Sequence, residues 1–180
     1  PTPPAGTCLY GVTIPPVGGN THFLNQHLAL ETMPDDLRSE LANCRGLHTA
    51  RRAYARDGRY AHYTGTMNIR PSDEALEVHA HPLVRAHPES ARPGLFAGSY
   101  VVALEDRPDD ESARLLGRVN EWLARPELYY DHRWEANMLV LWDNRSVLHR
   151  ATGGYEGYDR LLHRLTIADD TTFHVPAASG

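Results

Sequence analysis

Arg160 and Arg164 are the side chains whose type and spacing best suit the binding of an acidic small molecule. They lie in a β-prone segment, Arg160-Leu-Leu-His-Arg-Leu-Thr-Ile167, whose composition predicts a strand. Alternate residues of a strand share a face, so both guanidinium groups point the same way. A buried, unpaired charge is too costly to be left alone, and each of these cations therefore needs an anion opposite it. The segment predicts a site for an organic acid.

His149 lies in the preceding pair of apolar runs, at 138–142 and 146–150, which predict two further strands. The polar residues Asp143-Asn144-Arg145 between the runs predict a tight corner held by Asx-type hydrogen bonds. A single histidine in a strand is more often structural than a metal ligand. His149 taken alone therefore does not indicate a metal site.

The order of these residues resembles a known family of enzymes. The stretch Trp142-Asp-Asn-Arg-Ser-Val-Leu-His149, followed by Arg160 and Arg164, is similar to the C-terminal signature of the taurine and 2,4-dichlorophenoxyacetate dioxygenase family (TauD/TfdA). Four earlier stretches agree with that family in order and spacing: Pro3-Pro-Ala-Gly6, Gly18-Gly-Asn-Thr21, Met33-Pro34 and His81-Pro-Leu-Val-Arg-Ala-His-Pro88. The resemblance covers nearly the whole chain.

The resemblance implies a fold class, an activity and a set of cofactors. The fold would be mainly β with helices, a double-stranded β-helix (jelly roll) that is incomplete at its N-terminus. The activity would be that of a dioxygenase that uses Fe(II), 2-oxoglutarate as cosubstrate and O2 to hydroxylate a small organic anion. Sulfonates, sulfate esters, aryloxyalkanoates and amino-acid derivatives are all members of that substrate class.

The resemblance also assigns roles to individual residues. His149 would be the distal histidine of a facial triad of two histidines and one carboxylate, a ligand set that suits non-haem iron. Arg160 and Thr21 would hold the distal carboxylate of 2-oxoglutarate, because a guanidinium fork matches a carboxylate. Asn20 stands where the family usually has aspartate, directly before Thr21. The substrate-binding residues would be Arg164, Tyr100 and Trp142. Core packing is the alternative for the two aromatic residues, and a structural ion pair is the alternative for the arginine.

The His-x-Asp motif of the family is expected upstream of residue 1, so two of the three iron ligands are expected outside these 180 residues. This gap leaves open a second reading, in which the chain is a non-catalytic jelly-roll module that binds an organic acid through the two arginines. A third reading is a cupin-type metal enzyme. Cupins cluster His-x-His with a glutamate, and His79-Ala-His81 is followed by proline with no suitably spaced glutamate.

Bulk properties limit the classes of partner. The net charge of −5 argues against non-specific binding to nucleic acid, and no apolar run reaches the ~20 residues that span a bilayer. Two cysteines form neither a disulfide framework nor a metal-spacing pair, which favours a reduced, cytoplasmic setting. We expect a small-molecule substrate, no nucleic acid and no membrane, and the sequence leaves a homo-oligomer open.

A 180-residue chain with 41% hydrophobic residues predicts one globular domain over residues 1–180. Strands are expected at 7–14, 21–24, 129–134 and 160–168, in addition to the pair around the polar corner. Asn25 is expected to cap a helix at 26–31, Pro34 to open a second helix, and the clearest helix is expected at 109–125. Residues 45–73 are rich in Arg, Tyr, His and Gly and predict a lid or insertion.

Overall fold

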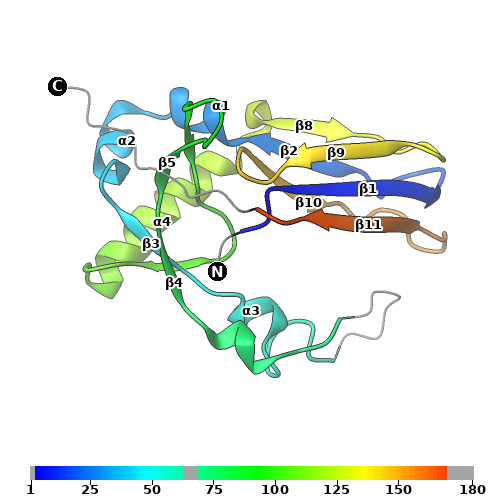
Figure 1. The fold of residues 1–180 in the computed structure, drawn as a ribbon, viewed down its shortest axis with the longest axis horizontal. Helices are drawn as coiled ribbons and strands as arrows, with labels where there is room; N and C mark the ends of the chain where they lie inside the picture. The colour runs from blue at the N-terminus through cyan, green and yellow to red at the C-terminus, as the bar shows by residue number, and fades with distance from the viewer. Residues whose placement is uncertain (1–2, 63–68, 170–180) are drawn as a thin grey trace. The chain divides into compact units, whose positions relative to one another are not determined.

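A computed structural model describes residues 3–62 and 69–169, whose strands and helices are labelled in Figure 1. The chain forms two compact units, which we describe separately. The first unit comprises Pro1–Pro34, Val84–Phe96 and Glu121–Gly180, and the second comprises Asp35–Leu83 and Ala97–Asn120. The single domain expected over residues 1–180 stays a prediction.

Two antiparallel three-stranded sheets of the first unit carry most of the residues expected at the site. Their strand orders are β11-β1-β9 and β10-β2-β8. The strands are β1 (Gly6–Thr13), β2 (Thr21–Asn25), β8 (Tyr129–His132), β9 (Leu139–Asp143), β10 (Val147–Ala151) and β11 (Leu161–Ile167). Each one lies within two residues of a strand expected from the sequence, so the hydrophobic pattern places these strands correctly.

Aromatic side chains join the facing sides of the two sheets. Phe23 on β2 is paired in register with His149 on β10. The ring of Trp142 on β9 contacts both of them, with centroid distances of 5.1 Å to Phe23 and 4.7 Å to His149. Because Trp142 belongs to the other sheet, these contacts place the three rings between the two sheets.

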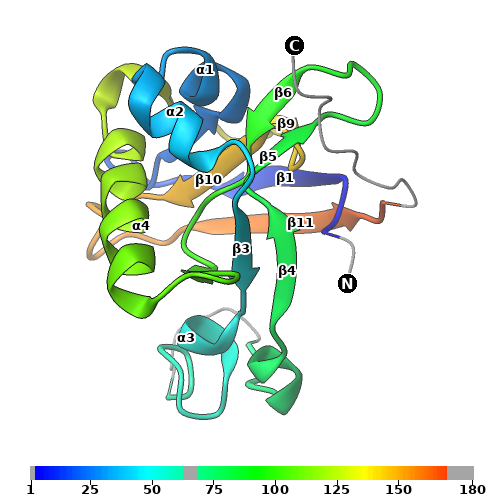
Figure 2. The same cartoon turned by 90° about the vertical axis from the view of Figure 1, so that its left-hand side faces the viewer.

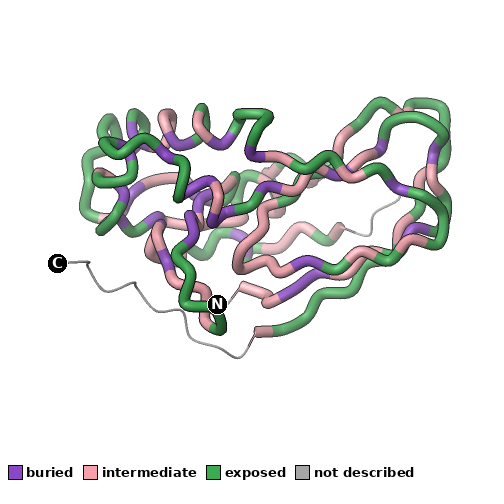
Figure 3. Tube along the Cα trace, turned by 90° about the horizontal axis from the view of Figure 1, so that it is seen from above, coloured by how far each residue is buried: buried purple, intermediate pink, exposed green. Residues whose placement is uncertain are grey.

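The opposite face of the β11-β1-β9 sheet is exposed and apolar. Leu139 and Leu141 alternate with the buried Trp142 along β9 and are 67% and 63% exposed, and Leu165 on β11 is 72% exposed. On β11 every residue except Leu162 is exposed. Figure 3 colours the Cα trace by burial, and the strand that leads to the grey C-terminal residues is mostly green. The face that carries Leu162 is therefore the inner one, and Arg164 belongs to it by alternation, while Arg160 directly precedes the strand.

Local capping sets the first helix, as the sequence predicts. The side chain of Asn25 accepts hydrogen bonds from the backbone N–H groups of His27 and Leu28, at 2.9 Å and 3.1 Å. These bonds satisfy donors that a helix leaves unpaired at its start. Four further short elements belong to the first unit: the helix α1 (Gln26–Glu31), the strands β5 (Val84–Ala86) and β6 (Pro93–Leu95), which pair with each other, and the 3-10 helix η2 (Pro126–Leu128).

The second unit is built on a sheet of order β4-β3-β7, whose strands β3 and β4 lie side by side in Figure 2. Its elements are α2 (Asp35–Leu41), β3 (Arg45–His48), α3 (Arg51–Tyr54), the 3-10 helix η1 (Asp73–Leu76), β4 (His79–Pro82), β7 (Val101–Leu104) and most of α4 (Asp109–Leu123). Helix α4 begins with three acidic residues, which suit the helix dipole, and buries Leu115 and Val119 on one face.

The expected lid at 45–73 contains regular structure. It includes the central strand β3 and the helix α3, while residues 63–68 lie outside the described part of the chain. Its role as a lid stays a prediction. Among the described residues, none of the helices combines the length and apolar character that a bilayer span requires.

Candidate active site

The imidazole of His149 is held between the two sheets by aromatic contacts. Its ring lies 4.7 Å from that of Trp142, and Trp142 is buried. Partial burial, and secondarily the positive charge of Arg164, lower the pKa of His149. The side chain nevertheless remains accessible from solvent. A lowered pKa keeps the imidazole neutral, which is the form that binds a metal.

Arg160 is anchored by the glycine turn that precedes Thr21. Its Nε donates a 3.0 Å hydrogen bond to the carbonyl oxygen of Gly19. A Cβ on residue 19 would lie 3.0 Å from Cδ and from Nε of Arg160, and Gly19 has a positive φ of 65°. The position therefore requires glycine, because any side chain would be strained and would crowd the guanidinium group.

The outer nitrogens of Arg160 are available to a ligand. The bond to Gly19 is the sole hydrogen bond of this guanidinium group within the described part of the chain, and its Nη atoms take no part in it. The ring of Tyr155 lies 5.7 Å from the guanidinium carbon. Partial burial lowers the pKa of Arg160, so its environment disfavours an unpaired charge. An organic carboxylate is the natural partner for such a fork.

Thr21 is a buried residue at the start of β2, two residues after Gly19. Its side chain is 2% exposed, and its Oγ1 accepts a 3.0 Å hydrogen bond from Nε1 of Trp134. Thr21 and Gly19, whose carbonyl oxygen accepts the hydrogen bond from Arg160, thus lie in one short segment.

Arg164 and His149 act on each other electrostatically although they belong to different sheets. Arg164 on β11 is paired in register with Leu9 on β1. Its charge contributes to the lowered pKa of His149. Across residues 3–62 and 69–169, no carboxylate forms an ion pair with Arg164, so the structural ion pair considered from the sequence is absent there. The cation is therefore exposed beside the imidazole.

The two aromatic residues expected to contact the substrate, Trp142 and Tyr100, lie in different units of the structure. Trp142 lies in the predicted region, packed against His149 and Phe23. Tyr100 belongs to the second unit, directly before β7, and its side chain is 45% exposed. The expectation that Tyr100 faces the substrate stays a prediction.

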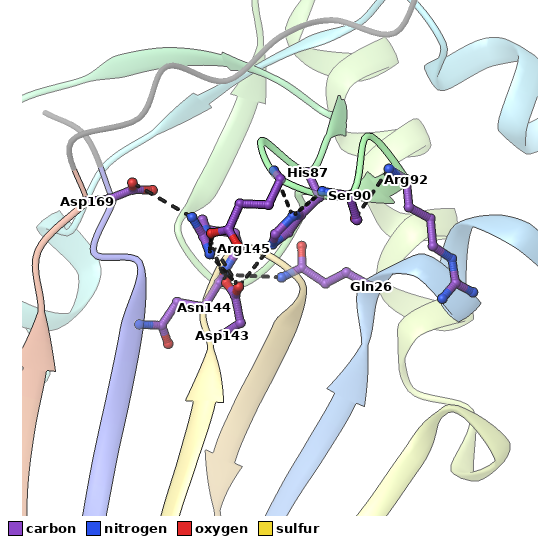
Figure 4. A network of polar contacts seen from close by, with 9 residues as sticks. Gln26, His87, Ser90, Arg92, Asp143, Asn144, Arg145 and Asp169 are labelled. Carbon is purple, nitrogen blue, oxygen red and sulfur yellow. Dashed lines mark hydrogen bonds and ion pairs between the residues drawn. The ribbon is translucent and has the colours of Figure 1, made fainter.

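The corner between β9 and β10 positions both Trp142 and His149. The backbone N–H of Arg145 donates to Oδ1 of Asp143 at 2.7 Å, which is the Asx-type bond expected from the sequence. The guanidinium group of Arg145 donates to the same carboxylate, and Nε2 of His87 lies 2.9 Å from its Oδ2 (Figure 4). Burial alone would raise the pKa of Asp143, but the hydrogen bonds from Arg145 and His87 outweigh it and lower the pKa to about 2.

We expect the Asp143 corner to make stability depend on pH below about 4. A carboxyl whose folded pKa is depressed stabilises the fold above its unfolded pKa of about 3.9, and this contribution is lost as the pH falls toward 2. Asp143→Asn should therefore destabilise the protein near pH 6 by about 1–3 kcal/mol, because it loses charge-assisted hydrogen bonds. The difference from wild type should shrink toward pH 2. Urea unfolding at both pH values tests this, and an equal difference at both would contradict it.

Sequence reasoning missed two aromatic residues beside Thr21. Trp134 donates to the Thr21 hydroxyl, and the ring of His132 lies 4.6 Å from the Trp134 ring. His132 is also the cross-strand partner of Thr21. Period-two alternation in the run Asp131-His-Arg-Trp134 would have placed His132 and Trp134 on one face, but nothing local relates that face to Thr21.

The described residues do not bring together a complete set of metal ligands. No group of three or more His, Cys, Asp or Glu side chains comes together among them. His149 is the ligand-type side chain in the position that the resemblance implies. His79 and His81 on β4 belong to no group of three or more such side chains that could hold a metal ion within the described residues, so the cupin-type site gains no support.

Comparisons with known proteins agree with this arrangement. The chain is 36% identical over 162 residues to the alpha-ketoglutarate-dependent 2,4-dichlorophenoxyacetate dioxygenase of Cupriavidus pinatubonensis, covering 90% of this chain and 54% of that protein. It is 30% identical over 173 residues to the (S)-phenoxypropionate/alpha-ketoglutarate-dioxygenase of Sphingobium herbicidovorans, covering 94% and 59%. The chain thus spans about half the length of the curated relatives it matches.

Solved structures confirm the predicted fold class. The crystal structure of AAD-2 in complex with Mn(II) and N-oxalylglycine superimposes with a TM-score of 0.79 at 27% identity, covering 95% of this chain and 66% of that one. The predicted jelly roll is therefore confirmed. The model of the family described as taurine catabolism dioxygenase TauD, TfdA family, matches residues 1–166. Because this match covers most of the 180 residues, the chain belongs to the TauD/TfdA family.

Proposed function

We propose that the full-length protein is an iron(II)- and 2-oxoglutarate-dependent dioxygenase that acts on a small organic anion. The observation that carries the proposal is that the guanidinium group of Arg160 is held in place but only partly hydrogen-bonded. Its Nε is fixed by Gly19, its Nη atoms are not hydrogen-bonded by the described residues, and partial burial disfavours an unpaired charge. Such a group binds the distal carboxylate of 2-oxoglutarate through paired, charge-assisted hydrogen bonds. Thr21 would donate to the same carboxylate.

His149 is proposed as one of the iron ligands. Its neutral imidazole is held by Trp142 in a fixed place between the sheets. The remaining ligands would come from outside the described residues, because these assemble no ligand cluster of their own. When bound, the iron would supply the activation of oxygen, while the protein orients the reactants and excludes water.

Arg164 is proposed to bind the anionic group of the substrate. It is a cation without an ion-pair partner among the described residues, and its charge reaches His149. This places the substrate anion near the proposed metal ligand, where a C–H bond of the substrate would be hydroxylated. The names of the relatives favour aryloxyalkanoates among the substrate class, and they give no support to a non-catalytic binding module.

A coupled assay tests the proposed function. The full-length protein is supplied with iron(II), 2-oxoglutarate, oxygen and one candidate substrate: an aryloxyalkanoate, a sulfonate, a sulfate ester or an amino-acid derivative. We expect succinate to form in a one-to-one ratio with consumption of one of these anions. Equal, low succinate formation with and without every anion would overturn the substrate class, and no succinate in any iron-loaded sample would overturn the activity.

A further inference from the structure

The indole of Trp134 makes the Thr21 hydroxyl oxygen a hydrogen-bond acceptor. Thr21 is the first residue of β2 and is 2% exposed. Nε1 of Trp134, a residue 113 positions further along the chain, donates a 3.0 Å hydrogen bond to Thr21 Oγ1. An indole N–H can only donate, so the threonine oxygen must be the acceptor in this bond. The hydrogen of the hydroxyl group is therefore directed elsewhere.

That hydrogen has no acceptor among the residues that the structure describes. The bond from Trp134 is the one hydrogen bond that the Thr21 side chain makes within those residues. A buried hydroxyl normally has its donor satisfied as well. The geometry thus gives Thr21 one free donor, which suits an acceptor-only group such as an ionised carboxylate.

The indole itself is held in one orientation. Trp134 is 7% exposed, and the ring of His132 packs against it edge to face, with centroids 4.6 Å apart and an interplanar angle of 88°. His132 is paired in register with Thr21 across β8 and β2. The same two strands therefore carry the hydroxyl and the aromatic ring that supports its partner, which limits the directions in which the Trp134 N–H can point.

We propose that Trp134 is a positioning residue that turns the Thr21 hydroxyl toward the carboxylate of 2-oxoglutarate. The inference rests on the proposed function, in which Thr21 and Arg160 bind that carboxylate. Without the indole N–H, the Thr21 hydroxyl is free to rotate and to donate to nearby backbone carbonyls, as threonine side chains commonly do. The donor would then be lost to the ligand although Thr21 itself is still present.

A double-mutant cycle measures this coupling. The dissociation constant of 2-oxoglutarate is determined by anaerobic calorimetry for the full-length, iron-loaded protein carrying Trp134→Phe, Thr21→Val or both. One neutral hydrogen bond corresponds to a change of about three- to tenfold, so Trp134→Phe should weaken binding by that factor. In the Thr21→Val background the same substitution should have no further effect, because the hydroxyl that it orients is gone. In turnover assays Trp134→Phe should raise KM for 2-oxoglutarate and leave kcat near wild type.

The matched control is Trp122→Phe. Nε1 of Trp122 donates a 2.8 Å hydrogen bond to the backbone oxygen of Ala29, outside the proposed site. This variant loses the same kind of donor and should bind 2-oxoglutarate as wild type does. If Trp134→Phe does not fold, replacement of Trp134 by benzothienylalanine keeps the bicyclic shape and removes only the N–H.

The outcomes separate this inference from the proposed function. Two results would overturn the positioning role of Trp134. In the first, Trp134→Phe weakens 2-oxoglutarate binding equally in the wild-type and the Thr21→Val protein. In the second, Thr21→Val weakens binding but Trp134→Phe does not. Unchanged binding in Thr21→Val would instead remove Thr21 from the proposed carboxylate site, and with it the basis of the inference.

Discussion

Replacing His149 with alanine is expected to abolish iron-dependent turnover of 2-oxoglutarate by the full-length protein. Loss of a residue that only supports a metal ligand costs about 10- to 100-fold, so loss of a ligand should cost at least ~100-fold in metal affinity or activity. The imidazole lies against Trp142 at the inner face of β10. The fold should survive, because the His149 side chain makes no hydrogen bond within the described residues and alanine keeps the backbone pairing of this position with Phe23. Metal content by mass spectrometry and succinate formation give the two readouts.

His163→Ala is the matched control for His149→Ala. His163 lies on β11 next to Arg164 in sequence, but alternation places it on the exposed face of the sheet. The His163→Ala protein should retain wild-type iron content and activity. Wild-type iron content in His149→Ala would show that the metal is held elsewhere.

Arg160→Ala is expected to weaken 2-oxoglutarate binding by about ten- to a hundredfold. One charge-assisted hydrogen bond is worth roughly 1.5–3 kcal/mol, and each 1.4 kcal/mol is a factor of about ten. Arg160→Lys should recover only part of the affinity, because an ammonium group lacks the planar fork and the Nε that donates to Gly19. Anaerobic calorimetry on the full-length, iron-loaded variants measures the effect directly.

The control for Arg160→Ala is Arg125→Ala. Arg125 pairs with Glu127 at 3.3 Å on an exposed part of the chain, so its loss removes a cation of the same kind away from the site. Binding should equal that of wild type. An Arg160→Ala protein that binds 2-oxoglutarate as tightly as this control would contradict the assignment of Arg160.

Local chemistry made much of the fold predictable. Asn25 caps α1 through its own side chain, and Asp143 closes the β9–β10 corner by bonding Arg145, two residues further on. Both features depend only on residues close in sequence, so the sequence could predict them. The expected helix at 109–125 ends two residues earlier, at Leu123. The strands of the first unit were predictable from alternating and apolar runs bounded by turn residues.

Features that depend on distant partners were not predictable. Alternation on β11 divides its residues into two faces but does not say which is inner, and the structure exposes Leu165 at 72% while Arg164 acts on His149. Similarly, β3 lies in a segment with little hydrophobic periodicity and becomes a central strand only because β4 and β7 pair with it. Tertiary pairing decides both cases.

In the candidate site, too, some features were predictable from the sequence and others were not. His149, Arg160 and Arg164 were recognisable because their spacing resembles a family signature. The bonds that fix the site join residues far apart in sequence: Arg160 to Gly19 and Trp134 to Thr21. No local pattern encodes such pairs, which is why Trp134 and His132 emerged only from the structure.

The central claim is that a metal at His149 and 2-oxoglutarate at Arg160 share one site between the two sheets. The most direct test is a crystal structure of the full-length protein grown anaerobically with Mn(II) and 2-oxoglutarate, with the metal located by its anomalous scattering. We predict an anomalous peak within bonding distance of the His149 imidazole, at about 2.0–2.3 Å, and the distal carboxylate of 2-oxoglutarate on Arg160 and Thr21. A metal peak away from His149, or a ligand whose carboxylate avoids Arg160, would contradict the account.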